Sequence, residues 1–246
     1  RPILFVAFTG EESGLLGSDY FVNSSSGGFQ VSSAFAMVNL DAVGRLDGRT
    51  LQIFGTESAY EWPFMAQGIG FTIGVSSQFA AQTVASSDHV SFLNAGIPAI
   101  HLFSGTHLDY HQPTDTQDKL DLAGMGDVAL WVEEAIVYLA DRADPLRVNL
   151  GRASQLSVSS STTAREAVLG TVPDFAYQGQ GIRISGVSPG GAAELAGLQA
   201  NDVIVQFNGQ AVDSLQTYSD RLRAATPGDE IEITVQRGEQ IFNVSA

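Results

Sequence analysis

Ile3-Leu4-Phe5-Val6-Ala7-Phe8-Thr9-Gly10-Glu11-Glu12 is a hydrophobic run that passes through a short turn into two adjacent carboxylates. The run predicts a buried strand, and an apparent helix follows the turn. In open α/β sheets, ligands collect at the carboxyl ends of strands. Adjacent carboxylates resist joint ionisation unless a cation or hydrogen bonds compensate them, so the pair indicates a ligand site. For the pair alone, an acidic helix amino-terminus is an equal alternative.

The composition limits the classes of function. The 246 residues are 44% hydrophobic, enough for a packed core. There is no uninterrupted apolar run of membrane-spanning length. The absence of cysteine excludes disulfides and thiolate metal sites. A net charge of −15 argues against nucleic-acid binding, which needs a basic surface. The opening at Arg1, directly into the expected strand, is typical of a fragment or a processed product.

Strands and helical stretches alternate along the first part of the chain. This predicts an α/β domain at 1–143, with a mixed, mainly parallel sheet and helices on both faces. The small polar residues of 157–163 indicate a linker, which we place at 144–164. A small α+β domain is expected at 165–246. The expected strands are 3–8, 34–40, 51–54, 71–75, 97–103, 182–187, 202–207, 230–236 and 240–245, and the expected helices are 13–23, 58–68, 88–94, 121–142 and 214–225.

Three further segments of the first domain carry polar residues next to expected strands. Asn39-Leu40-Asp41 ends one strand, Ser87-Asp88-His89 opens a short helix, and residues 106–116 form a loop after the strand 97–103. Carboxylates combined with histidine suit zinc or a similar divalent ion. Ligands this far apart in the sequence are expected of an enzyme site assembled from several strand ends.

With these motifs in view, residues 1–143 resemble the co-catalytic zinc aminopeptidases, which include bacterial leucyl aminopeptidases. Glutamate carboxypeptidase, glutaminyl cyclase and the transferrin receptor ectodomain are relatives of that family. The resemblance implies a zinc-exopeptidase-like fold and covers the motifs in the same order and spacing. The matching strings are Thr9-Gly10-Glu11-Glu12-Ser13-Gly14-Leu15-Leu16-Gly17-Ser18, Asn39-Leu40-Asp41, Ser87-Asp88-His89 with Phe92, and Asp109-Tyr110-His111 with Pro113 and Asp115-Thr116.

The resemblance implies a role for each matching residue. Glu11 matches the general base that activates a water bridging two metal ions, and Glu12 matches a ligand of one ion. Asp41 and His111 match ligands of the other ion. Tyr110 matches a side chain that hydrogen-bonds the oxyanion in some members, and Asp88 has a supporting role. Two zinc ions would lower the pKa of the water and polarise the scissile carbonyl.

The sequence also departs from the family pattern. The family supplies a histidine and a metal-bridging aspartate from segments before the Gly-Glu-Glu strand, and this chain contains neither. One ion keeps Glu12 alone, and the other keeps Asp41 and His111. We therefore expect this chain in isolation to bind metal weakly and to be inactive as a hydrolase, the activity belonging to a parent protein with two zinc ions.

The remaining polar residues of these segments are interpreted as structural. His101 lies within a hydrophobic strand and is expected to be buried, and His89 is expected to pack or cap beside Asp88. His107 is expected to lie behind the ligands or to be exposed. The carboxylates Asp109, Asp115 and Asp118 are interpreted as turn formers or caps.

Residues 166–246 are similar to PDZ domains of the bacterial protease type, most clearly over 177–207. The resemblance implies that Gly179-Gln180-Gly181-Ile182 is the loop that receives a peptide carboxylate. Strand 182–187 would then pair with an added peptide strand, and helix 214–225 would form the other wall. Leu222 on that helix is expected either to line the groove or to pack in the core, and the core is the preferred interpretation. Asn208-Gly209 predicts a hairpin turn.

The combined interpretation is a zinc-dependent aminopeptidase that removes amino-terminal residues from peptides, with a PDZ domain for peptide or partner binding. An acidic pocket suits an α-ammonium group, whereas a carboxypeptidase needs arginines for the substrate carboxylate. The alternatives are a glutaminyl cyclase-like enzyme, in which Asp88 matters more, and a non-catalytic interaction protein. The resemblance, rather than any residue, implies a bacterial and extracytoplasmic protein that is secreted, periplasmic or membrane-tethered.

Overall fold

The computed structural model describes residues 1–24, 30–80, 87–151 and 167–246. The chain divides into two compact units. The first unit comprises Arg1–Gly105 and Leu120–Ser160, and the second comprises Thr106–Lys119 and Ser161–Ala246. The expected linker 144–164 falls largely outside the described residues, as does the expected start of the second domain at 165.

The first unit is built on a four-stranded sheet with the strand order β1-β4-β2-β3. β1 pairs with β4 and β2 with β3 in parallel, whereas β2 and β4 are antiparallel. This arrangement confirms the predicted mixed, mainly parallel sheet. The strands are β1 (Met37–Leu40), β2 (Leu51–Phe54), β3 (Ser77–Phe79) and β4 (Ala99–Phe103).

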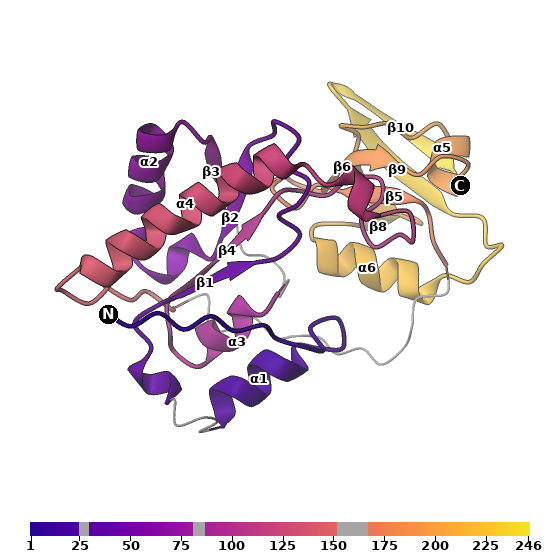
Figure 1. Cartoon of the computed structure of the whole chain (residues 1–246). Helices are drawn as coiled ribbons and strands as arrows, with labels where there is room; N and C mark the ends of the chain where they lie inside the picture. The colour runs from indigo at the N-terminus through magenta and orange to yellow at the C-terminus, as the bar shows by residue number, and fades with distance from the viewer. Residues whose placement is uncertain (25–29, 81–86, 152–166) are drawn as a thin grey trace. The chain divides into compact units, whose positions relative to one another are not determined.

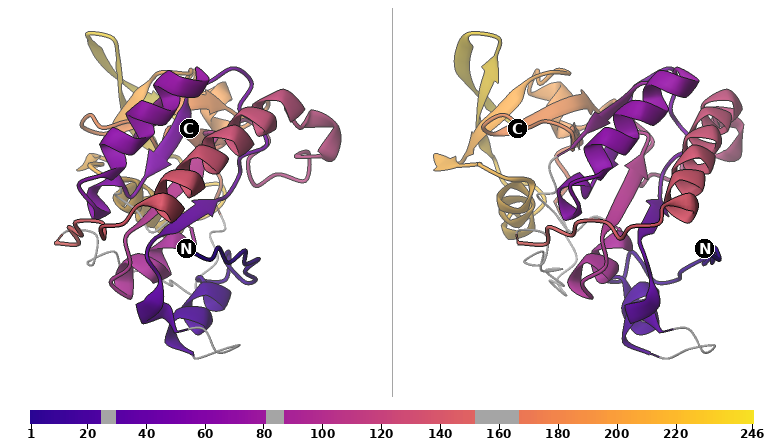
Figure 2. Two further views of the ribbon diagram at one scale, coloured as in Figure 1. Left: turned by 60° about the vertical axis from the view of Figure 1, so that its left-hand side comes forward. Right: turned by 90° about the vertical axis from the view of Figure 1, so that its left-hand side faces the viewer.

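Helices cover both faces of this sheet, as predicted, because successive side chains of a strand point to opposite faces. Ile100 and Leu102 of β4 belong to the larger core with α2 and α4, whereas Ala99 packs in a smaller core with α1 and α3. Figures 1 and 2 show α2 beside α4, and α3 beside α1. The helices are α1 (Leu16–Asn23), α2 (Trp62–Ile73), α3 (His89–Asn94) and α4 (Leu122–Asp141), with 3-10 turns η2 (Val31–Ser33) and η3 (Thr56–Ser58).

The predicted strand at 3–8 is wrong. Residues 3–8 pair with no strand in the described part of the chain, and Phe5 is 82% exposed. Figure 1 shows the segment as an indigo coil that starts at the amino-terminus. Only Phe8 is well anchored, with its ring centroid 5.5 Å from Phe21 and 6.0 Å from Phe92. Strand-forming residues do not make a strand by themselves, because the backbone groups also need a neighbouring edge to pair with.

The predicted strand at 71–75 is also wrong, because Phe71, Thr72 and Ile73 continue α2. The helix ends at Gly74, whose φ of 76° is left-handed and whose N–H donates to the Gly70 carbonyl. Glycine adopts this conformation without strain, so the sequence does contain a helix stop at this position. The strand that follows, β3, begins only at Ser77.

The carboxy-terminal part of the second unit, residues 167–246, is called the module below. Its antiparallel sheet has the order β10-β9-β7-β6-β5, with β8 paired to β7. Ile184, Ile204 and Ile233 form its core with Tyr218 and Leu222 of α6. The elements are β5 (Thr171–Pro173), β6 (Ile182–Val187), α5 (Ala192–Leu195), β7 (Val203–Phe207), β8 (Gln210–Ala211), α6 (Leu215–Ala224), β9 (Glu232–Arg237) and β10 (Gln240–Ser245).

The predicted hairpin turn of the module is confirmed. Asn208 and Gly209 have φ values of 50° and 71°, and they connect the antiparallel strands β7 and β8. A two-residue turn with positive φ at both positions matches the twist of the flanking strands.

Residues 106–119, called the 106–119 loop below, form part of the second unit although the expected first domain contains them. The only regular element in the described loop is the 3-10 turn η4 (Gln117–Lys119). Among the described residues of the whole chain, none of the helices has the length and apolar character needed to cross a bilayer.

Candidate active site

The Gly-Glu-Glu turn is held against the start of α1 by close backbone contacts. The N–H of Gly14 donates to the Glu11 carbonyl over 2.9 Å, and the N–H of Gly17 donates to the Thr9 carbonyl over 2.9 Å. A Cβ at Gly17 would overlap the Thr9 carbonyl oxygen, and Gly10 has a φ of 69°. The two glycines are therefore needed for the shape of this turn.

Glu11 lies among the other carboxylates of the first unit. Its pKa is raised from 4.5 to about 7, first by burial and then by the negative charges of Glu12, Asp41 and Asp88 in that order. The structure therefore brings four of the sequence-predicted residues of the first unit into one electrostatic cluster. Such a cluster repels itself unless protons or a cation neutralise it.

Asp41 is oriented by two buried polar side chains. It directly follows β1, and its Oδ2 accepts a hydrogen bond of 3.0 Å from the Ser87 hydroxyl. Asn39 Nδ2 donates to the same hydroxyl over 2.8 Å. Ser87 thus accepts from Asn39 and donates to Asp41, which fixes the direction of its proton. Sequence reasoning missed this orientation, although polar residues in otherwise buried segments signal it.

Asp88 sits at the start of α3 and is only 8% exposed. Burial raises its pKa, which a hydrogen bond from Ser18 partly offsets, and Asp41 and Asp19 add repulsion. Its Oδ1 has no hydrogen-bond partner within the described residues. The carboxylate is therefore desolvated beside the cluster, and a neutralising proton or cation would stabilise it.

His89 and His101 form a buried stacked pair behind the cluster. Their ring centroids are 4.9 Å apart, and His89 and His101 are 0% and 3% exposed to solvent. Burial lowers the pKa of His101 to about 4, and burial also holds the pKa of His89 well below its usual range. Asn39 Nδ2 lies 3.2 Å from His101 Nδ1. Both imidazoles are therefore neutral at pH 7 and fill the interior, in agreement with the sequence interpretation.

The 106–119 loop places Tyr110 and His111 against each other. Their rings stack with centroids 4.1 Å apart. His111 is exposed and has a φ of 58°, in the left-handed region that non-glycine residues seldom occupy. Strained backbone of this kind is frequent at functional sites.

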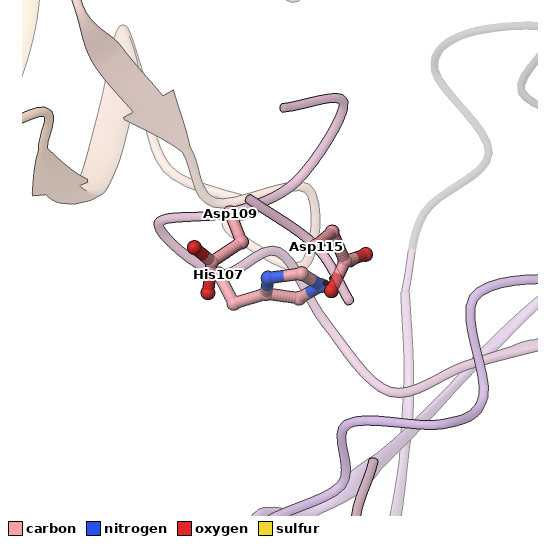
Figure 3. Close-up of side chains that lie close together, drawn as sticks. All are labelled: His107, Asp109 and Asp115. Carbon is pink, nitrogen blue, oxygen red and sulfur yellow. Dashed lines mark ion pairs between the residues drawn. The ribbon is translucent and has the colours of Figure 1, made fainter. Parts of the chain in front are cut away.

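The same loop gathers a second set of possible ligands. Side-chain atoms of His107, Asp109 and Asp115 lie within 4.8 Å of one another, close enough to hold a metal ion. Figure 3 shows the His107 ring between the two carboxylates. Lys119 Nζ is 2.5 Å from Asp109 Oδ1, so this carboxylate already has a cation beside it. His107 Nε2 is 3.8 Å from Asp115 Oδ2, an interaction that the interpretation of Asp115 as a turn former or cap did not include.

The expected peptide edge of the module is not open. β6 pairs with β7 on one side and with β5 on the other, so an added peptide strand has no free edge on 182–187. Ile182 and Leu222 are 5% and 4% exposed and belong to the core. A Cβ at Gly181 would contact the Ile204 carbonyl, so this glycine permits strand packing. The assignment of Gly179, Gln180, Gly181 and Ile182 to peptide binding is therefore corrected.

β5 forms one edge of the module's sheet, and β10 forms the other. Sequence reasoning missed β5 because this strand has only three residues. β5 is the last strand of the sheet, and Gly170 directly before it has a φ of 83°. The Thr171 and Tyr218 hydroxyls are 2.7 Å apart, which places the strand beside α6. An edge strand beside a helix is the arrangement that binds peptides by strand addition.

These features define a mixed α/β protein with a carboxylate cluster suited to a divalent cation, followed by an antiparallel module in which the edge strand β5 lies beside a helix. Comparison with known families identifies both parts. Peptidase family M28 matches residues 1–136, more than half of the chain, and the chain belongs to this family. The PDZ domain matches residues 183–237.

Relatives resemble the two parts separately. A Halomonas elongata protein described as a probable periplasmic, DegP-like serine endoprotease is 35% identical over 66 residues. The match covers 27% of this chain and 14% of that protein. The serine endoprotease DegS of Salmonella typhimurium is 40% identical over 62 residues, covering 25% of this chain and 17% of that protein. The LapA aminopeptidase structure of Legionella pneumophila is 28% identical with a TM-score of 0.50, covering 58% of this chain and 40% of that chain. The chain thus spans less than half the length of each.

Proposed function

We propose that the protein is a zinc-dependent aminopeptidase, with Glu11 as general base and Tyr110 as hydrogen-bond donor to the oxyanion. Glu12 would bind one zinc ion, and Asp41 and His111 would bind the second. The observation that carries the proposal is the burial of Glu11 together with the gathering of three carboxylates around it, which raise its pKa to about 7. A general base works best with a pKa near the working pH. The roles of Tyr110 and His111 rest on the family match.

The donor set fits zinc, since carboxylate and imidazole are its usual oxygen and nitrogen ligands. The mutual repulsion within the cluster and the desolvated Asp88 both favour a bound cation. Bound zinc would polarise the scissile carbonyl and acidify the attacking water.

The side chains then divide the reaction between them. Glu11 takes a proton from the attacking water and passes it to the leaving amino group. Tyr110 stabilises the negative charge that develops on the carbonyl oxygen. Ser87 keeps the Asp41 carboxylate in one orientation through its 3.0 Å hydrogen bond.

The number of proposed ligands predicts weak metal binding by this chain. Zinc sites in proteins use three or four side chains, whereas one ion here has one proposed ligand and the other has two. Calorimetric titration of the 246-residue chain with zinc should therefore give weak binding. Two tight sites would contradict this part of the proposal.

Preference for free amino-termini follows from charge. The carboxylate cluster attracts an α-ammonium group, whose charge complements it. A carboxypeptidase would instead need a guanidinium for the substrate carboxylate.

The protein at its natural length provides the decisive experiment: hydrolysis of a panel of amino-acid p-nitroanilides, with and without chelator. Chelator-sensitive release should fall by at least about 100-fold in Glu11→Gln. Glu57→Gln is the matched control, because Glu57 is also a desolvated glutamate of the first unit whose raised pKa has no carboxylate neighbour among its causes. Zinc binding without release from any substrate would contradict an aminopeptidase and favour a glutaminyl cyclase-like reaction, in which the buried Asp88 beside Glu11 takes a larger part. Failure to bind zinc would favour an interaction protein.

For the module, we propose that a peptide carboxy-terminus binds along β5, with α6 as the second wall. The edge position of β5 and the 2.7 Å contact between Thr171 and Tyr218 support this position. Peptides selected from a carboxy-terminal library should lose affinity when backbone amides that face β5 are N-methylated, and should retain it when outward amides are. Equal effects at both sets of amides would contradict strand addition. The resemblance of the module to periplasmic proteases supports an extracytoplasmic location.

A further inference from the structure

Alternate residues of the 106–119 loop contact the module. The Thr106 hydroxyl donates to the Pro173 carbonyl over 2.6 Å and lies 3.2 Å from the Ser185 hydroxyl. The Leu108 side chain lies beside Gly186 of β6, where an added Cβ would be 3.1 Å from Leu108 Cδ2. The Tyr110 ring meets the Phe175 ring edge to face, with centroids 6.2 Å apart at 79°. The module therefore holds the loop at three successive points.

Phe175 contacts Tyr110, which has a proposed catalytic role and stacks on the proposed ligand His111. Tyr110 also meets the His107 ring edge to face with centroids 5.9 Å apart, so Phe175 is its third ring neighbour. Phe175 lies in the turn directly after β5 and is half-buried. His107 and His111 belong to the loop itself, so Phe175 is the neighbour that fixes the Tyr110 ring relative to the module, and each such contact has a preferred geometry.

The loop needs external support. Most of residues 108–119 are exposed, and the backbone is regular only over η4. His111 has a strained φ of 58°. Strained backbone persists only where surrounding structure imposes it, and side chains that act in catalysis need packed neighbours to hold them within a fraction of an ångström.

We propose that Phe175 of the module is a positioning residue for the Tyr110–His111 pair of the 106–119 loop. The proposal rests on the function proposed above for Tyr110 and His111. Phe175 does not touch substrate. It acts by fixing the Tyr110 ring and, through the ring stack, the direction of the His111 imidazole.

The first test uses Phe175→Ala in the protein at its natural length, loaded with zinc. We expect kcat to fall about tenfold, KM to change less than twofold, and zinc to be lost faster to a competing chelator. Phe175→Tyr keeps the ring and should restore kcat. Phe242→Ala is the matched control, because Phe242 is a partly buried phenylalanine that packs on the module core and stacks with Arg237. A kcat for Phe175→Ala within twofold of wild type, or an equal loss in Phe242→Ala, would overturn the proposal.

A double-mutant cycle tests the route through Tyr110. If Phe175 acts through this ring, Phe175→Ala should reduce kcat no further in a Tyr110→Ala background. Full additivity of the two losses would overturn the route.

Hydrogen exchange of the 246-residue chain gives an answer independent of activity. Amides of residues 106–119 should exchange at least severalfold faster in Phe175→Ala and remain unchanged in Phe242→Ala. If the wild-type protein has no peptidase activity, the proposed function fails, and this readout still decides whether Phe175 positions the loop. Unchanged exchange in Phe175→Ala would overturn the inference even if the wild type is an active aminopeptidase.

Discussion

The carboxylate cluster of the first unit and the 106–119 loop of the second are supported in different ways. Asp41 directly follows a strand, and buried Asn39 and Ser87 orient it from within the same unit. Tyr110 and His111 lie on an exposed loop whose described supports are Thr106, Leu108 and Tyr110 against the module. The cluster is therefore held by the core of its own sheet, whereas the loop is held by the module, from which it is distant in the sequence. A substitution should damage each region through a different measurable property.

Removing a proposed ligand from each region is expected to have the largest effect and to separate the regions most clearly. Asp41→Asn and His111→Ala should each lower peptidase activity at least about 100-fold at fixed zinc concentration. Only Asp41→Asn should stabilise the metal-free chain at pH 8. It removes a negative charge that repels the ionised Glu11, the same repulsion that raises the pKa of Glu11.

Activity assays and thermal melts of metal-free protein test this pair. Asp47→Asn is the control, since Asp47 is a half-exposed aspartate of the same unit that pairs with Arg45 and Arg49. Stabilisation by His111→Ala equal to that by Asp41→Asn would break the comparison.

The next largest effect is expected at Ser87, whose hydroxyl donates to Asp41 of the cluster and accepts from Asn39. Ser87→Ala removes the hydrogen bond to Asp41 and should weaken zinc binding by about 10-fold, the lower end for residues that orient a ligand. Ser87→Thr keeps the hydroxyl and should retain most of the affinity. Competition with a chromogenic chelator measures both variants, and equal losses in the two would contradict an orienting hydrogen bond.

The pH dependence of stability in metal-free protein should show whether Glu11 of the cluster titrates with a raised pKa. Glu11 has a pKa of about 7 when folded against 4.5 ordinarily, so the folded chain keeps a proton that the unfolded chain releases. The contribution of Glu11 to stability is then highest below pH 4.5 and falls as pH rises towards 7. Melting temperatures of Glu11→Gln should fall less over this interval than those of wild type or Glu57→Gln, and saturating zinc should flatten the wild-type curve. Identical slopes for Glu11→Gln and wild type would show that Glu11 does not titrate in this range.

The smallest effect is expected at Thr106, one of three supports of the loop. Thr106→Val removes its hydrogen bonds to Pro173 and Ser185 and should speed exchange of the loop amides by a fewfold, with zinc affinity changed less than in Ser87→Ala. A loss of zinc affinity larger than that of Ser87→Ala would reverse the ranking of the two regions.

The sequence by itself determined the class of fold and much of the candidate site. The strand limits 51–54, 182–187 and 240–245 agree with the structure, because alternating β-branched residues bounded by turn residues act over a few neighbours. The motif around Glu11 likewise carries the glycines that its turn needs. Local chemistry is sufficient for such features, since the residues that determine them are adjacent in the chain.

Only the tertiary structure decided which edges and faces are occupied. Residues 3–8 have strand-forming side chains but pair with no described strand, and β6 has neighbours on both edges, so the edge strand beside α6 is β5. The attachment of the 106–119 loop to the second unit depends on contacts such as Tyr110 with Phe175, 65 positions apart in the sequence. Strand pairing and loop packing depend on distant partners, and a local pattern contains no information about which partner is present.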